Sequence, residues 1–135
     1  MVGASCVLGF ALLGGTAGAV GSQFASSGFP TGTFLTKITI ADLQRAGLDP
    51  NDAHWEKVTY RADGTWVDVW FHPRLPDQPP AHGRYTVRGD KLRLLGTPDT
   101  VRWQYDGHAL RFKVIRVPDR LARLVYTAHP WQRIR

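Results

Sequence analysis

One cysteine is all that the 135 residues contain, and it is Cys6, close to the amino terminus. A domain that begins after Cys6 has no disulfide, no thiol nucleophile and no cysteine-bound metal. Charge is also missing from the start of the chain, where no acidic or basic side chain precedes Lys37. The apolar stretch Val7–Val20 is rich in glycine and shorter than the about 20 residues of a membrane-spanning helix. A signal peptide is therefore favoured over a membrane anchor.

The uncharged start has the main parts of a secretory signal peptide. Val7–Leu13 would form the apolar region and Ala17–Ala19 the small-residue cleavage site, although the usual basic segment before them is missing. Ser22–Pro30 consists mostly of small residues and is expected to be a flexible tether. We predict a secreted or cell-envelope protein, with residues 1–28 as signal peptide and flexible segment. Residues 29–135 then form one domain.

Signatures of catalysis and of cofactor binding are scarce. The five histidines lack metal-site spacing, and there is no nucleophile elbow, phosphate loop or dinucleotide fingerprint. His54 with Glu56, or Asp68 with His72, can pair as general acid and base, but alternating strand residues produce such pairs by chance. His129 is a candidate axial ligand of haem iron. We predict no catalytic residue, no metal and no cofactor, with a haem-binding or isomerase-type barrel as an alternative.

Positive charge exceeds negative charge, and the excess lies in one half of the chain. The net charge is +6, made of −2 over residues 1–79 and +8 over residues 80–135. Most of these basic residues alternate with apolar ones, as solvent-facing strand positions do. Because no nucleic-acid motif or basic helix accompanies them, we predict no nucleic-acid partner. An anionic cell envelope stays a possible partner of this half.

Turn sequences recur at short intervals between runs of strand-forming residues. They are Asp63-Gly64, Gly89-Asp90, Gly96-Thr97-Pro98-Asp99, Asp106-Gly107 and Pro118-Asp119. Such turns join neighbouring antiparallel strands, and a meander hides its edges by closing on itself. We predict an all-β, eight-stranded antiparallel up-and-down barrel. The expected strands are Gly32–Thr39, His54–Arg61, Thr65–Phe71, Arg84–Val87, Lys91–Leu95, Thr100–Tyr105, His108–Ile115 and Leu121–Ala128.

Two segments between the strands have their own character. Ile40–Leu48 is predicted to be a short helix, because Thr39 suits its N-cap, Gly47 suits its end, and apolar residues recur three apart. We expect this helix to cover the mouth of the barrel as a lid. His72–His82 is a proline-rich loop that Gly83 ends. After the last strand, Trp131 is expected to close one end of the barrel, and Arg133 to stack on an aromatic ring or bind carbonyls.

Period-two alternation assigns the side chains of the later strands to an inner and an outer face. The inward residues are Tyr85, Val87, Leu92, Leu94, Val101, Trp103, Tyr105, Leu110, Phe112 and Val114. Strand Thr65–Phe71 leaves two possibilities, with Trp66, Asp68 and Trp70 on one face and three apolar residues on the other. The tryptophan face is favoured as the inner one, because five tryptophans are best placed around a cavity. With the opposite assignment, the two tryptophans would form an exposed docking patch.

The chain resembles a known superfamily of small barrels. Gly32-Thr33-Phe34 is similar to the Gly-x-Trp that opens the lipocalin barrel, and the early helix resembles the lid of fatty-acid-binding proteins. Both belong to the calycin superfamily. More closely, Asp63-Gly64-Thr65-Trp66, Gly83-x-Tyr85, Trp103-x-Tyr105 and Pro130-Trp131-x-Arg133 are similar to lipocalin-like modules of actinobacterial secreted proteins. Some of those modules are appended to solute-binding proteins of ABC transporters.

The resemblance covers residues 32–134 and implies a barrel that binds a small apolar or amphipathic ligand. The residues expected to contact that ligand are Trp66, Asp68, Trp70, Tyr85, Trp103, Phe112 and Tyr126. Asp68 and a basic rim would orient its polar end. A non-catalytic module that docks on a transporter component or the cell envelope is the alternative, and its marker is a filled barrel.

Overall fold

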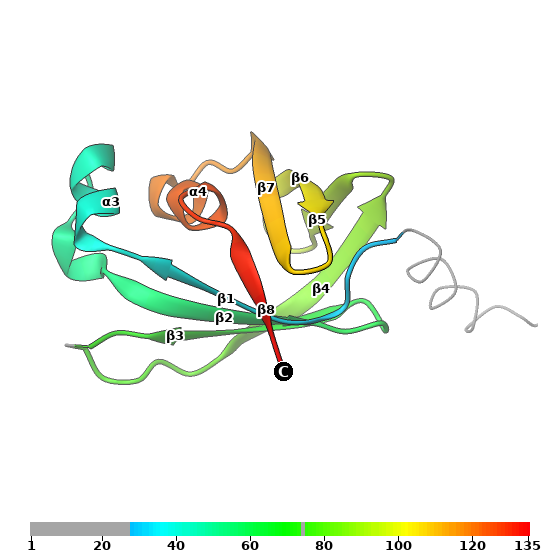
Figure 1. Ribbon diagram of the computed structural model, residues 1–135, viewed down its shortest axis with the longest axis horizontal. Helices are drawn as coiled ribbons and strands as arrows, with labels where there is room; N and C mark the ends of the chain where they lie inside the picture. The colour runs from blue at the N-terminus through cyan, green and yellow to red at the C-terminus, as the bar shows by residue number, and fades with distance from the viewer. Residues whose placement is uncertain (1–27, 74) are drawn as a thin grey trace, which may run out of the picture.

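The computed structural model describes residues 28–73 and 75–135, which form a closed barrel of eight antiparallel strands (Figure 1). This confirms the predicted fold class. Each strand pairs with the next in the chain, and β8 returns to pair with β1 through three residue pairs. Cys6 and the predicted signal segment and cleavage site lie outside the described residues.

The strands are β1 (Gly32–Ile38), β2 (His54–Tyr60), β3 (Thr65–Phe71), β4 (Ala81–Arg88), β5 (Lys91–Leu94), β6 (Thr100–Tyr105), β7 (Ala109–Arg116) and β8 (Trp131–Ile134). Helix α3 (Ile40–Ala46) and a single 3-10 turn, η2 (Pro50–Asp52), connect β1 to β2, and α4 (Arg120–Thr127) connects β7 to β8. In Figure 1, α4 lies beside β7, on the side of α3. None of the helices among these residues is long and apolar enough to cross a membrane.

The last strand was predicted in the wrong place. Leu121–Ala128 is helical, and the eighth strand is Trp131–Ile134. Asp119 accepts a hydrogen bond from the Ala122 amide at 2.8 Å and so caps α4. The residues that α4 turns inward are Leu121, Ala122, Val125 and Tyr126, and only a helix places such neighbouring pairs, four residues apart, on one face. The expectation that the chain has no basic helix is also wrong, because α4 carries Arg120 and Arg123.

The proline-rich loop is shorter than predicted. Strand β4 begins at Ala81, which pairs with Asp68, so His82 and Gly83 belong to the strand and not to the loop. The prolines of this segment end at Pro80, and from Ala81 onward the backbone can join the ladder of β3.

Helix α3 forms for the predicted reason. Thr39 and Asp42 make a capping box, in which the Asp42 amide donates to Thr39 Oγ1 at 3.1 Å and the Thr39 amide donates to Asp42 Oδ2 at 2.9 Å. Gly47 ends the helix with a φ of 70°, a left-handed conformation that glycine adopts without strain. The hydrogen bonds from Thr39 lower the pKa of Asp42 although its burial raises it.

Aromatic side chains fill one end of the barrel. Phe29 packs against Tyr60, Tyr85 and Trp103 with ring centroids 5.1 to 5.6 Å apart. Phe29 is 5% exposed, so the predicted tether Ser22–Pro30 ends within the core and not before it. Burial of the ring explains the difference, because a phenylalanine gains about 1.5–3 kcal/mol when it leaves water.

Arg133 of β8 makes the contacts predicted for it, to a carbonyl and to an aromatic ring. Its guanidinium donates to the Thr31 carbonyl at 2.9 Å and to the Tyr105 hydroxyl at 3.2 Å, and it lies 5.5 Å from the centre of the Phe34 ring. Phe34, on β1, is fully buried. These contacts reinforce the short pairing of β8 with β1.

Candidate functional site

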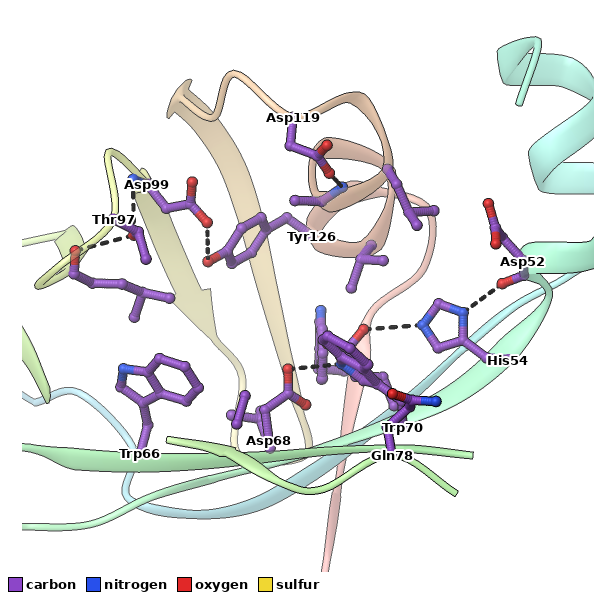
Figure 2. A pocket seen from close by; sticks show the side chains of 18 of the residues that line it. Asp52, His54, Trp66, Asp68, Trp70, Gln78, Thr97, Asp99, Asp119 and Tyr126 are labelled. Atoms are coloured by element: carbon purple, nitrogen blue, oxygen red, sulfur yellow. Dashed lines mark hydrogen bonds and ion pairs between the residues drawn. The ribbon is translucent and has the colours of Figure 1, made fainter. Parts of the chain in front are cut away.

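A cavity of about 470 Å³ occupies the barrel beyond the aromatic core. Strands β2 and β3 supply one wall, and helix α4 with the loop between β5 and β6 supplies the opposite one (Figure 2). Trp70 and Leu75 also line it, and they are 38% and 47% exposed. The cavity therefore reaches solvent near the end of β3.

The ambiguous face of β3 is now assigned. Trp66, Asp68, Trp70 and His72 all line the cavity, while Phe71 of the opposite face is 42% exposed on the outside. The favoured assignment is confirmed. Figure 2 shows Trp66 and Asp68 rising from the strand toward Tyr126 of α4.

Four of the seven residues expected to contact a ligand line this cavity, namely Trp66, Asp68, Trp70 and Tyr126. Tyr126 reaches it from a helix and not from the predicted strand. Tyr85 is 1% exposed in the aromatic core, and its hydroxyl donates to the Arg61 carbonyl. Tyr85 is therefore surrounded by side chains and packs in the core.

Trp103 and Phe112 lie elsewhere as well. The indole of Trp103 packs on Phe29 and donates to the Gly89 carbonyl at 3.1 Å. Phe112 packs edge-on against Tyr126 at 5.4 Å, behind the cavity wall. Both line a second cavity of about 320 Å³, whose other lining residues are largely polar and charged.

Gly83 makes room for the indole of Trp66. The two residues are paired across β3 and β4, and a Cβ on Gly83 would lie 2.9 Å from Trp66 Cζ2. The indole also donates to the Arg84 carbonyl at 3.2 Å, which holds the ring along the strand. The absence of a side chain at Gly83 thus determines the position of the Trp66 indole in the cavity wall.

Replacing Gly83 by alanine is expected to lower the free energy of unfolding by about 1–3 kcal/mol, because the added methyl group overpacks the site. Without the clash, alanine would stabilise the strand relative to glycine. Urea unfolding measures the effect, and the same substitution made in a Trp66→Leu background should cost much less. A Gly83→Ala protein as stable as the wild type would show that the indole does not need this space.

The centre of the cavity wall is a pair of carboxyl groups. The Trp70 indole donates to Glu56 Oε1 at 2.7 Å and to Asp68 Oδ2 at 3.0 Å, which draws the two groups together. Glu56 Oε2 lies 3.2 Å from His54 Nε2, and His54 Nδ1 lies 2.6 Å from the Asp52 carbonyl. Of the two acid–base pairs considered from the sequence, His54 and Glu56 are therefore in contact.

Burial favours the protonated forms of both Glu56 and Asp68. Burial raises the pKa of Asp68 to about 9, and the hydrogen bond and charge of Glu56 add to the effect. Burial also raises the pKa of Glu56, while its hydrogen bonds with Asp68 and Trp70 oppose the rise. Two carboxylates cannot hydrogen-bond without a proton, and near neutral pH Asp68 keeps the proton that this contact needs.

A second polar contact lies on the opposite wall. The Tyr126 hydroxyl donates to Asp99 Oδ2 at 3.3 Å (Figure 2). Burial raises the pKa of Asp99, and the bond from Tyr126 partly offsets it. Burial, followed by the charge of Asp99, raises the pKa of Tyr126, so this phenol stays protonated.

The charge of the cavity differs from that expected. Its lining includes the carboxyl-bearing residues Asp52, Glu56, Asp68, Asp99 and Asp119, and no lysine or arginine of the described residues. The predicted basic rim is therefore wrong for this part of the chain. The basic residues of the second half point outward from the strands, as the alternation indicated, while the carboxyl groups gather inside.

Apart from His54, the histidines lie outside the arrangements considered from the sequence. His129 Nε2 lies 2.8 Å from Asp42 Oδ2, at the start of α3, and is no part of the main cavity. His72 lies 5.0 Å from His54, ring to ring, whereas His82 is exposed on β4. Within the described ranges, no three side chains of metal-binding type come close enough to hold an ion.

The helix that borders the cavity is not the expected one. Leu43 of α3 is fully buried in the core, but no residue of α3 lines the cavity. Leu121, Ala122, Val125 and Tyr126 of α4 do. Of the two helices, α4 is therefore the one positioned to cover the cavity.

No family model, curated protein or solved structure matches this chain. The site must therefore be interpreted from its own geometry. Sequence reasoning overlooked Glu56 and Asp99 as lining residues. For Glu56 a signal was present, because it alternates with Val58 and Tyr60 on one face of β2. Asp99 comes from a turn, where alternation assigns no face.

Proposed function

We propose that this barrel binds a small apolar or amphipathic molecule in the cavity beside β3 and α4. The observation that carries the proposal is the cavity itself, of about 470 Å³, in a barrel whose other end is filled by Phe29 and its aromatic neighbours. This volume falls in the range of about 300–1,000 Å³ typical of ligand pockets.

The walls suit such a ligand. Trp66, Trp70 and Tyr126 present large apolar surfaces, and Val58 and Leu94 extend them. Apolar surface that leaves water contributes about 25 cal/mol per Å², before the costs of ordering and association. Polar groups are few and gathered in two places, at Glu56 with Asp68 and at Asp99, which would orient the ligand.

The resemblance to lipocalin-like modules supports the same proposal, which also includes secretion and a place in the cell envelope. A transporter component stays a proposed partner on that resemblance alone. The docking alternative predicted a filled barrel with exposed tryptophans on β3. The cavity, and the position of Trp66 and Trp70 on its wall, favour the ligand-binding role.

The proposal is tested with N-phenyl-1-naphthylamine, a neutral dye that fluoresces in apolar surroundings. The wild-type chain should bind it, and Ala122→Trp should weaken binding at least about tenfold, because the indole fills space that Ala122 leaves open on α4. Fluorescence titration gives both dissociation constants.

Ala41→Trp serves as the matched control, because Ala41 is exposed on the other helix, α3, away from the cavity. Its affinity for the dye should equal that of the wild type. If the dye binds all three proteins alike, it binds outside the cavity. If it binds none of them, the small-ligand proposal fails.

A further inference from the structure

Resting on the proposed function, we propose that the ligand is a cationic amphiphile, whose protonated amine is bound by Glu56 and Asp68 while the aromatic walls enclose its apolar part. The inference starts from the contrast between a chain of net charge +6 and a cavity lined by carboxyl groups. In the part of the chain that the structure describes, no lysine or arginine lines the cavity to balance them.

The first step concerns Glu56. Its side chain is buried, with only 6% of the residue exposed, and its hydrogen-bond partners are the Trp70 indole, His54 and Asp68. A buried carboxylate is costly unless an opposite charge pairs with it. The basic group nearest to it among the described residues is the imidazole of His54, 3.2 Å from Glu56 Oε2, and no lysine or arginine lines the cavity. Asp68, on the other side of the Trp70 indole, has no basic partner of this kind among the residues described, and an ammonium group would supply one.

The second step concerns which carboxyl oxygens of the cavity still lack a hydrogen-bond donor. Asp119 caps α4, Asp99 accepts from Tyr126, and Asp68 Oδ2 accepts from Trp70. Asp68 Oδ1 is buried, and no protein donor reaches it. An ammonium group has three donors and no acceptor, so it complements a wall that offers acceptors. A ligand carboxylate would instead add a second negative charge beside Glu56.

The third step concerns the surroundings of the pair. Trp66 and Trp70 flank Asp68 on β3, Tyr60 lies on β2, and Tyr126 stands across the cavity (Figure 2). Aromatic faces attract cations within about 6 Å, most strongly where water is excluded. The same rings bury an apolar chain. One set of side chains therefore suits both parts of an amphiphilic amine.

The test compares three probes that share a ten-carbon chain: decylammonium, decanol and decanoate. Titration of the full chain at pH 7, followed by tryptophan fluorescence and calorimetry, should give an affinity for decylammonium at least about tenfold above that for the other two. Asp68→Asn and Glu56→Gln should each weaken decylammonium binding about tenfold and leave decanol binding within about twofold.

Asp90→Asn is the matched control, because it makes the same aspartate-to-asparagine change on an exposed side chain that does not line the cavity. It should leave all three affinities unchanged. Equal binding of the three probes would overturn the proposal of a cationic ligand, and so would decylammonium binding that survives both cavity substitutions. Either result would leave the small-ligand proposal standing. Binding of no probe would contradict both proposals.

Discussion

Asp68→Asn is expected to stabilise the ligand-free protein, and the gain should grow as the pH rises. Burial raises the pKa of Asp68 from 3.8 to about 9, so the folded state binds a proton that the unfolded state releases. The stability from this group is complete below about pH 4 and is lost as the pH rises through about 9. Asparagine is neutral at every pH and can donate to Glu56 while it accepts from Trp70.

Urea unfolding at pH 5, 7 and 8.5 measures the effect. The free energy of unfolding of the variant, relative to that of the wild type, should rise by at most about 1.4 kcal/mol per pH unit, because one proton is involved. At pH 8.5 we expect an advantage of about 2 kcal/mol or more over the difference at pH 5. A difference that does not change with pH would contradict the protonated pair.

Asp106→Asn is the opposite control. Bonds from the Ala109 and His108 amides and from Arg111 lower the pKa of Asp106 to about 2. The carboxylate therefore stabilises the fold throughout the range from pH 5 to 8.5, and its loss should lower stability by an amount that does not vary with pH. The two aspartates thus predict profiles of different shape.

Phe34→Ala is expected to lower the free energy of unfolding by about 3–5 kcal/mol, because a fully buried aromatic ring leaves a cavity that the barrel cannot close. The ring packs edge-on against Tyr105 at 6.0 Å and lies under the guanidinium of Arg133. The substitution therefore also weakens the junction of β1 with β8. Denaturant unfolding followed by tryptophan fluorescence gives the loss.

Phe71→Ala provides the comparison within the same barrel. Phe71 is 42% exposed on the outer face of β3, below Lys57. Its removal should change the stability by no more than about 0.5 kcal/mol, as most surface substitutions do. Similar losses for the two phenylalanines would contradict the inner and outer faces assigned to β1 and β3.

Most of the barrel follows from local patterns. Turn residues such as Asp63-Gly64 and Asp106-Gly107 separate the strands, and alternation placed Tyr85, Leu92 and Leu110 inside. The error at Leu121–Ala128 came from counting strand-like residues where Asp119 begins a helix. Its inward residues Leu121 and Val125 lie four apart, a spacing that both helices and strands place on one face, so the capping aspartate was the better signal.

The candidate site was predicted less completely. Alternation gave the face of Trp66, Asp68 and Trp70 only as a preference, since either face of that strand is apolar enough to be buried. Glu56 and Asp99 come from other elements, and their approach depends on how the barrel closes. The same holds for Phe112, which faces inward as predicted but lies behind Tyr126.

By itself, the sequence determined the first seven strands, the capped helix after β1 and the inward set of apolar side chains, because turns, caps and alternation act between residues a few positions apart. Only the tertiary structure decided that α4 borders the cavity, that Gly83 yields space to Trp66, and that Glu56 and Asp68 meet at the Trp70 indole. These features depend on distances between residues of different elements, which closure of the barrel sets and no local pattern records.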